Sequence, residues 1–103
     1  MANKTLTRGE ILQMVVFDLG YIQPDDATKD RLMIDIDAAE RFLQETGIAV
    51  SIDDGVEVND AQILAMYAAY LFERRRMPDN PMPRMLQWHI HNRLLAQKMK
   101  ETE

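Results

Sequence analysis

The apolar residues of the chain recur at helical spacing in four stretches. The first stretch covers about residues 8–19, and its apolar positions are Ile11, Leu12, Met14, Val15 and Leu19. Thr7 and Glu10 fit a capping box in front of it, and Gly20 follows as a residue that accepts the left-handed conformation common just past helix ends. The pattern predicts a first helix over about residues 8–19.

A longer stretch, about residues 27–46, has a single apolar face with four-three-four spacing, formed by Leu32, Ile36, Ala39 and Leu43. Asp25 and Asp26 precede it and can cap a helix, where negative charge also suits the positive end of the helix dipole. Gly47 supplies the stop. The sequence therefore predicts a long second helix with its acidic residues mostly toward water.

The segment from Gly47 to Asn59 has a different period. Its apolar residues alternate with small or polar ones, at Ile48, Val50 and Ile52 before the turn-like Asp53-Asp54-Gly55 and at Val56 and Val58 after it. This period of two predicts either a small β-hairpin or an extended loop. Because an isolated hairpin is barely stable in water, its apolar side needs a cover, either the helical core of the same chain or a neighbouring molecule.

The third helical stretch ends in three arginines. Asn59 and Gln62 resemble a second capping box, and the apolar face that follows consists of Ile63, Leu64, Tyr67, Tyr70 and Leu71. We expect this helix to run to about Arg75. Arg74, Arg75 and Arg76 suit the helix C-terminus, but one or two cations would suffice there. Contact with an acidic partner is an equally weighted interpretation, and contact with DNA is a minor one.

Three prolines between Met77 and Pro83 separate the third stretch from the last, because proline lacks an amide donor and clashes with the preceding helical turn. Pro83 suits the first position of a new helix. That fourth helix is predicted over about residues 83–98, with Leu86, Ile90 and Leu94 spaced four apart and with Trp88, Leu95 and Met99 beside them.

These elements predict one all-α domain over residues 1–103, with about four helices in a small orthogonal or bundle-like arrangement and flexible ends at 1–6 and 100–103. The chain has no cysteine, which excludes disulfides and thiolate chemistry and fits a reducing compartment. No apolar run reaches the roughly 18 residues of a membrane span. The first residues lack the apolar core of a signal peptide, so we expect a soluble intracellular protein.

Charge is divided unevenly along the chain. Residues 1–60 hold five lysines and arginines against thirteen aspartates and glutamates, whereas residues 61–103 hold seven against four. The overall net charge of -5 argues against a general nucleic-acid binder, because the phosphate backbone repels an acidic protein. Acidic and basic halves suit head-to-tail contact between copies or with a charged partner. Two ordinary solvated faces are an equally weighted interpretation.

Candidate catalytic and metal-binding residues are few. His89 and His91 lie two residues apart on a predicted helix, so they point about 200° away from each other and cannot share a metal. Asp35 and Asp37 have the same spacing, and Asp53-Asp54 sits in a turn where aspartate is favoured in any case. The sequence has no phosphate-binding glycine loop and no pairing of a nucleophile with a base. We therefore expect neither an enzyme nor a cofactor or metal site.

The order of segments supports a family resemblance. A short helix opened by Thr7 and Glu10 precedes a long helix with an alanine-rich acidic centre, IDIDAAERFLQETG. A variable loop, the arginine-terminated AQILAMYAAYLFERRR, a proline break and the amphipathic MPRMLQWHIHNRLLAQK follow. Over about residues 7–97 this order resembles the head–tail connector, or head-completion adaptor, proteins of tailed bacteriophages and prophages. The last helix departs from the family pattern in holding Trp88, His89 and His91.

The resemblance implies a non-enzymatic structural protein of DNA packaging and virion assembly. Such proteins assemble with copies of themselves into about a dodecamer below the portal protein, extend the DNA channel and dock the tail-side stopper or completion protein. The implied location is the host-cell cytoplasm during assembly and then the head–tail junction of the virion. DNA would pass through without specific binding, and an acidic channel wall suits that passage because it offers no adhesive phosphate contacts.

Carried over to this chain, the resemblance assigns two groups of candidate interface residues. Candidates for contact between subunits lie in the acidic second helix and the arginine run: Asp35, Asp37, Glu40, Arg74, Arg75 and Arg76. Candidates for contact with a neighbour or the channel lie in the loop between the second and third helices: Ile48, Val50, Ile52, Val56 and Val58.

Two other functions compete with the adaptor. A small helical DNA-binding regulator could place its fourth helix in a groove through Arg84, His91, Asn92, Arg93 and Lys98, although the net charge argues against it. A small metal-assisted hydrolase would have to use the Asp53-Asp54 turn, which lacks the ligand spacing of a calcium-binding loop.

Overall fold

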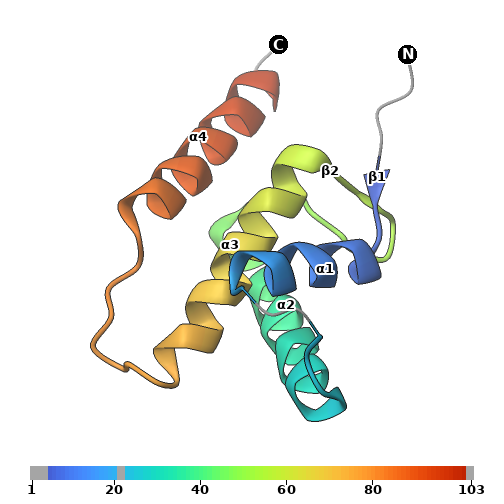
Figure 1. The fold of residues 1–103 in the computed structure, drawn as a ribbon. Helices are drawn as coiled ribbons and strands as arrows, with labels where there is room; N and C mark the ends of the chain where they lie inside the picture. Colours follow the sequence, from blue (N-terminus) through green and yellow to red (C-terminus); the bar gives the residue numbers. More distant parts are fainter. Residues whose placement is uncertain (1–4, 21–22, 102–103) are drawn as a thin grey trace.

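The computed structural model describes residues 5–20 and 23–101, and within them the all-α fold class is confirmed. These residues form four helices and a minimal two-stranded sheet. The helices are α1 (Arg8–Asp18), α2 (Asp26–Thr46), α3 (Val58–Arg74) and α4 (Arg84–Glu101), and the strands are β1 (Thr5–Leu6) and β2 (Val56–Glu57). Figure 1 shows α1 crossing α3, with α2 packed against both and α4 alongside α3. The core therefore forms between the first three helices, and α4 is attached at one side.

Side-chain caps fix the starts of the first two helices as predicted. The Thr7 hydroxyl accepts the Glu10 N–H at 3.3 Å, and the Glu10 carboxylate accepts the Thr7 N–H at 3.1 Å, which completes the capping box. Asp25 accepts the Thr28 N–H at 2.8 Å at the start of α2. Gly47 ends α2 with a φ of 109°, a conformation that residues with a side chain rarely adopt.

The predicted cap at the start of the third helix is wrong. Asn59 lies inside α3, and the N-cap position is Glu57, whose side chain makes no capping hydrogen bond. The helix begins early because β2 pairs with β1 up to Glu57 and leads directly into Val58.

The short sheet also decides between the two alternatives for the segment after α2. Val56–Glu57 pairs antiparallel with Thr5–Leu6, so the segment from 48 to 55 is a loop and not one arm of a hairpin. Gly55 turns the chain with a φ of 86°, and a Cβ there would lie 3.1 Å from Thr5. Thr5 and Leu6, which the sequence analysis places in a flexible start, belong to the sheet, and Leu6 is only 8% exposed; residues 1–4 lie outside the described part.

The last helix is held to the body by its inner face and by hydrogen bonds. Leu86 and Ile90 are buried against the core. Arg93 Nε donates to Asp60 at 2.7 Å, and the Gln97 side chain donates to the Gly47 carbonyl at 2.6 Å and accepts from the Ala49 N–H at 2.7 Å. The helix extends to Glu101, three residues past its predicted end, and residues 102–103 lie outside the described part.

Candidate interaction surfaces

The arginine run and the acidic helix do pair, but within one chain. Arg75 approaches the two carboxylate oxygens of Asp35 at 2.7 and 2.9 Å, and the Asp35 side chain is 2% exposed. Burial raises the pKa of Asp35 above its ordinary value of 3.8, and the nearby Arg75 only partly opposes that rise. The candidate contact between subunits at these two residues is therefore used inside the monomer.

The other acidic candidates of α2 are also engaged internally. Asp37 forms an ion pair with Arg8, which also approaches Asp53 at 3.5 Å. A carboxylate oxygen of Glu40 accepts the Ile52 N–H at 2.6 Å and so ties the loop to α2. The acidic face of α2 organises its own chain, which removes much of the reason for assigning it to a partner.

The apolar loop does not offer a surface for a neighbour. Ile48, Val50, Ile52 and Val56 are between 2% and 9% exposed, because the helical core of the same chain covers them. Only Val58 of that candidate set, at the first residue of α3, remains exposed. A contact of this loop with a neighbour or a channel would therefore have no exposed side chain to use at these four residues.

Two arginines of the run remain on the surface. Arg74 and Arg76 are exposed, whereas Arg75 turns to Asp35. Arg74 lies close enough to Tyr67 to oppose the rise in the pKa of that phenol, which follows first from burial and then from the neighbouring Tyr70. Of the predicted interface residues, the surface ones are therefore Val58, Arg74 and Arg76, together with the partly exposed Asp37 and Arg75 that are already paired.

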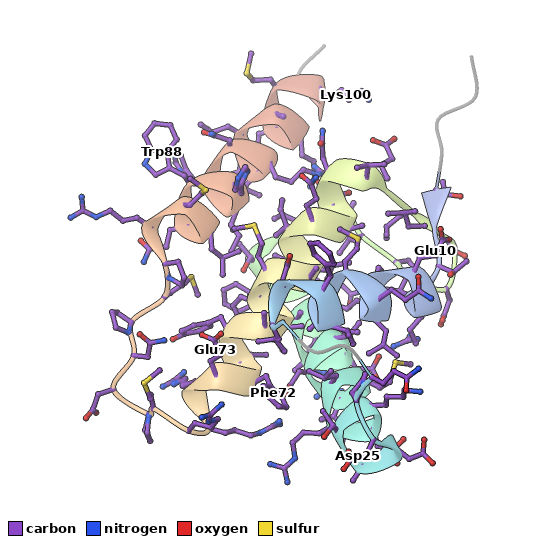
Figure 2. The ribbon with its side chains drawn as sticks, viewed as in Figure 1. Glu10, Asp25, Phe72, Glu73, Trp88 and Lys100 are labelled. Atoms are coloured by element: carbon purple, nitrogen blue, oxygen red, sulfur yellow. The ribbon has the colours of Figure 1, made fainter. Side chains whose placement is uncertain are left out.

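Four of the eight exposed large apolar side chains of the described chain lie on α4. Its outer face carries Met85, Trp88, Leu95 and Met99, which are 67%, 67%, 46% and 69% exposed. With Asn92 between them, these positions alternate three and four residues apart, the spacing that aligns the contact positions of paired helices. Figure 2 shows Trp88 projecting from α4 away from the body of the molecule. We call these five residues the α4 stripe.

The α4 stripe is flanked by basic and imidazole side chains. Arg84, His91 and Lys98 are exposed and seven residues apart, so they line one edge, and His89 lies at the other. Residues 84–100 contain no aspartate or glutamate. A hollow of about 570 Å³ opens in the stripe between Gln87, Trp88, His91, Asn92 and Leu95. The surface is apolar along most of its length, with Asn92 in the middle, and it carries positive charge along the edge that holds Arg84 and Lys98.

A second exposed apolar site lies on α1. Phe17 is 84% exposed, the most exposed of the large hydrophobic residues in the described chain. It stands at the edge of a groove of about 580 Å³ between α1 and α3, whose apolar lining includes Leu6, Met14 and Met66. The same groove is lined by Glu10 and Asp18. We call Phe17 with this groove the α1 site, and its charge is opposite to that of the α4 stripe.

The histidines and the Asp53-Asp54 turn lie on the surface of the molecule. Among the described residues, no group of three or more histidine, cysteine, aspartate or glutamate side chains is placed to hold a metal ion. His89 and His91 are both exposed, and the Asp53 side chain is 89% exposed and approaches only Arg8. Every buried side-chain nitrogen or oxygen in the described part has a hydrogen-bond partner.

Comparison with known proteins finds no family model, no curated protein and no solved structure that matches this chain. Searching the described helices for a membrane span also finds none with the required length and apolarity.

Sequence reasoning missed both exposed apolar sites. Trp88, Leu95 and Met99 were placed beside the buried residues of the last helix, and Phe17 was not singled out. A signal for the α4 stripe was present, because its three-four spacing is continuous over the helix. No comparable signal marks Phe17, since a single exposed apolar residue is common on protein surfaces.

Proposed function

We propose that this protein is a non-enzymatic adaptor that assembles with copies of itself and docks larger components, as the head–tail connectors it resembles do. The observation that carries the proposal is the presence of two exposed apolar sites of opposite charge on one small domain: the α4 stripe and the α1 site. Exposed apolar residues with charged edges are typical of protein interfaces, where the apolar centre supplies affinity and the charges supply orientation.

Two unlike sites on one domain favour an open-ended or ring assembly over a closed pair. In Figure 2, Trp88 of the α4 stripe lies on the opposite side of the domain from Glu10, in the first turn of α1. Contact between unlike surfaces leaves one of each free on every new pair, so copies continue to add until the rotation closes a ring. A ring below a portal protein, with a tail-side protein on its other face and DNA passing through, is the assembly that the resemblance suggests.

The DNA-binding regulator is the less favoured alternative. Of the residues that would enter a groove, Arg93 donates to Asp60, Gln97 and the Ala49 carbonyl, so its charge is already engaged. The centre of the exposed face of α4 is apolar rather than basic. Phosphate contacts need several free cations on one face, which this helix offers only at its edges.

Light scattering on the purified protein tests the proposal. We expect the weight-average mass to rise with concentration and to fall when salt is raised, because the charged edges of both sites are solvent-exposed. A strict monomer at millimolar concentration, indifferent to salt, would contradict self-assembly. Anisotropy with duplex DNA at low salt is the parallel measurement, and tight, steeply salt-dependent binding there would favour the regulator.

A further inference from the structure

We propose that Phe17 of one copy inserts into the hollow of the α4 stripe of a second copy, between Trp88, Asn92 and Leu95. This inference rests on the proposed self-assembly and specifies the two surfaces that meet. It makes the contact heterologous, with the α1 site of one subunit against the α4 stripe of the next.

The receiving surface has the geometry of a socket in paired helices. Trp88, His91, Asn92 and Leu95 are three, four and seven residues apart, the arrangement of four residues that encloses a side chain from a facing helix. Trp88 and Leu95 provide apolar walls at its two ends, and the hollow is open to solvent in the monomer. Nothing in the described part of the chain covers it.

The inserting side chain is suited to that socket. Phe17 lies in the last turn of α1 with 84% of its surface exposed, so it protrudes from a helix rather than from a mobile loop. An aromatic ring brings a large apolar area with little loss of conformational entropy, and it packs favourably against a second aromatic ring such as Trp88. The three-four spacing of the stripe is the spacing that helix against helix pairing uses, and Phe17 lies on a helix.

Charge selects the α1 site over other possible partners of the stripe. Glu10 and Asp18 line the groove beside Phe17, while Arg84, His91 and Lys98 edge the stripe. One basic residue, Lys29, lines a second hollow on the other side of Phe17. The acidic side of Phe17 is therefore the side toward the groove between α1 and α3. Docking of the stripe on this site places opposite charges together around a desolvated aromatic centre.

Pairing of α4 with α4 of another copy is the competing arrangement. Residues 84–100 contain four lysines and arginines and no acidic residue, so two such helices would bring like charges together. An antiparallel pair would set the edge formed by Arg84, His91 and Lys98 against the same edge of its partner. The α1 site carries no such penalty, which is why we assign it to the socket.

Single substitutions at the two ends of the contact provide the first arm of the test. Phe17→Ala removes the knob and Trp88→Ala removes a wall of the socket, and both residues are exposed, so neither change disturbs the core. Each variant alone is expected to associate about 30-fold or more weakly than the wild type, as for truncation of a central interface residue. Ile34→Ala is the matched control, since Ile34 is 61% exposed and lies on α2, away from both sites.

Mixing the two variants provides the decisive arm. The Trp88→Ala chain keeps Phe17 and the Phe17→Ala chain keeps the socket, so a heterologous contact predicts that the mixture forms a one-to-one dimer and stops there. Sedimentation velocity distinguishes this dimer from the monomers and from wild-type assemblies. Circular dichroism and thermal melting of each variant confirm that the fold is unchanged.

The alternatives give different results. If α4 pairs with α4, Trp88→Ala abolishes association, Phe17→Ala leaves it intact and mixing restores nothing, which overturns the inference. If the wild type assembles and neither substitution matters, the inference fails while the self-assembling adaptor stands. If the wild type remains monomeric at millimolar concentration, both the inference and the proposed self-assembly fail.

Discussion

The loop between α2 and α3 and the helix α4 are both rich in apolar residues, but they differ in how far the fold buries those residues. The sequence left open whether the core of the same chain or a neighbouring molecule covers the loop, and the structure buries Ile48, Val50, Ile52 and Val56 under the helices of the same chain. The last helix looked like an ordinary core element, but it buries Leu86 and Ile90 on one side and exposes Met85, Trp88 and Leu95 on the other. An apolar pattern identifies the apolar residues of a segment. Tertiary packing then decides which of them are buried within the same chain.

The largest effect that separates these two regions is expected from truncating one apolar residue in each. Ile48→Ala should lower the free energy of unfolding by about 2–4 kcal/mol, because Ile48 is 2% exposed and its removal leaves a cavity. Trp88→Ala should change it by no more than about 0.5 kcal/mol, because the residue lies on the surface. Urea unfolding at low protein concentration, where copies stay apart, measures both. Similar losses in the free energy of unfolding for the two variants would contradict the assignment of the loop to the core and of the α4 stripe to the surface.

The ion pair beneath the arginine run gives the next largest contrast. Arg75→Leu leaves the Asp35 carboxylate buried without its cation, and we expect a loss of about 2–3 kcal/mol. This is below the cost for a fully buried pair, because the Arg75 side chain is 39% exposed. Arg76→Leu is the matched control, one residue away and exposed, with an expected change within about 0.5 kcal/mol. Equal effects in urea unfolding would show that the pair contributes nothing specific.

Local signals in the sequence predicted the helices well. Thr7 with Glu10, Asp25 and Gly47 act through neighbours a few residues away, so their roles as helix ends are confirmed in the structure. The third cap failed because its start depends on a distant strand: Glu57 pairs with Thr5, far away in sequence. Residue spacing within one segment contains no information about such a partner.

The surfaces could be predicted only in part, for the same reason. The pairing of Asp35 with Arg75 joins α2 to the end of α3, and sequence pattern gave only the charges and not the match. In α4 the spacing shows two apolar faces, but it does not say which one faces the core. In the structure the face that holds Arg93 and Gln97 is bonded to Asp60 and to the Gly47–Ala49 turn, contacts that lie far away in sequence, and Trp88 points outward.

The smallest expected effect is a difference in pH dependence between two aspartates of the same helix. Burial raises the pKa of Asp35, so the native state holds its proton at pH values where the unfolded chain has lost it. The contribution of Asp35 to stability is therefore fully present below its ordinary pKa of 3.8 and is lost as the pH rises through the raised value.

Asp25 behaves oppositely, because its hydrogen bonds with Thr28 lower its pKa. Its contribution is present above 3.8 and is lost as the pH falls through the lowered value. Unfolding free energies of the wild type, Asp35→Asn and Asp25→Ala across acidic pH test this. The wild type minus Asp35→Asn should decrease as pH rises, whereas the wild type minus Asp25→Ala should increase. A rise in both differences would mean that Arg75 outweighs burial at Asp35, and that this carboxylate stabilises the fold by its charge.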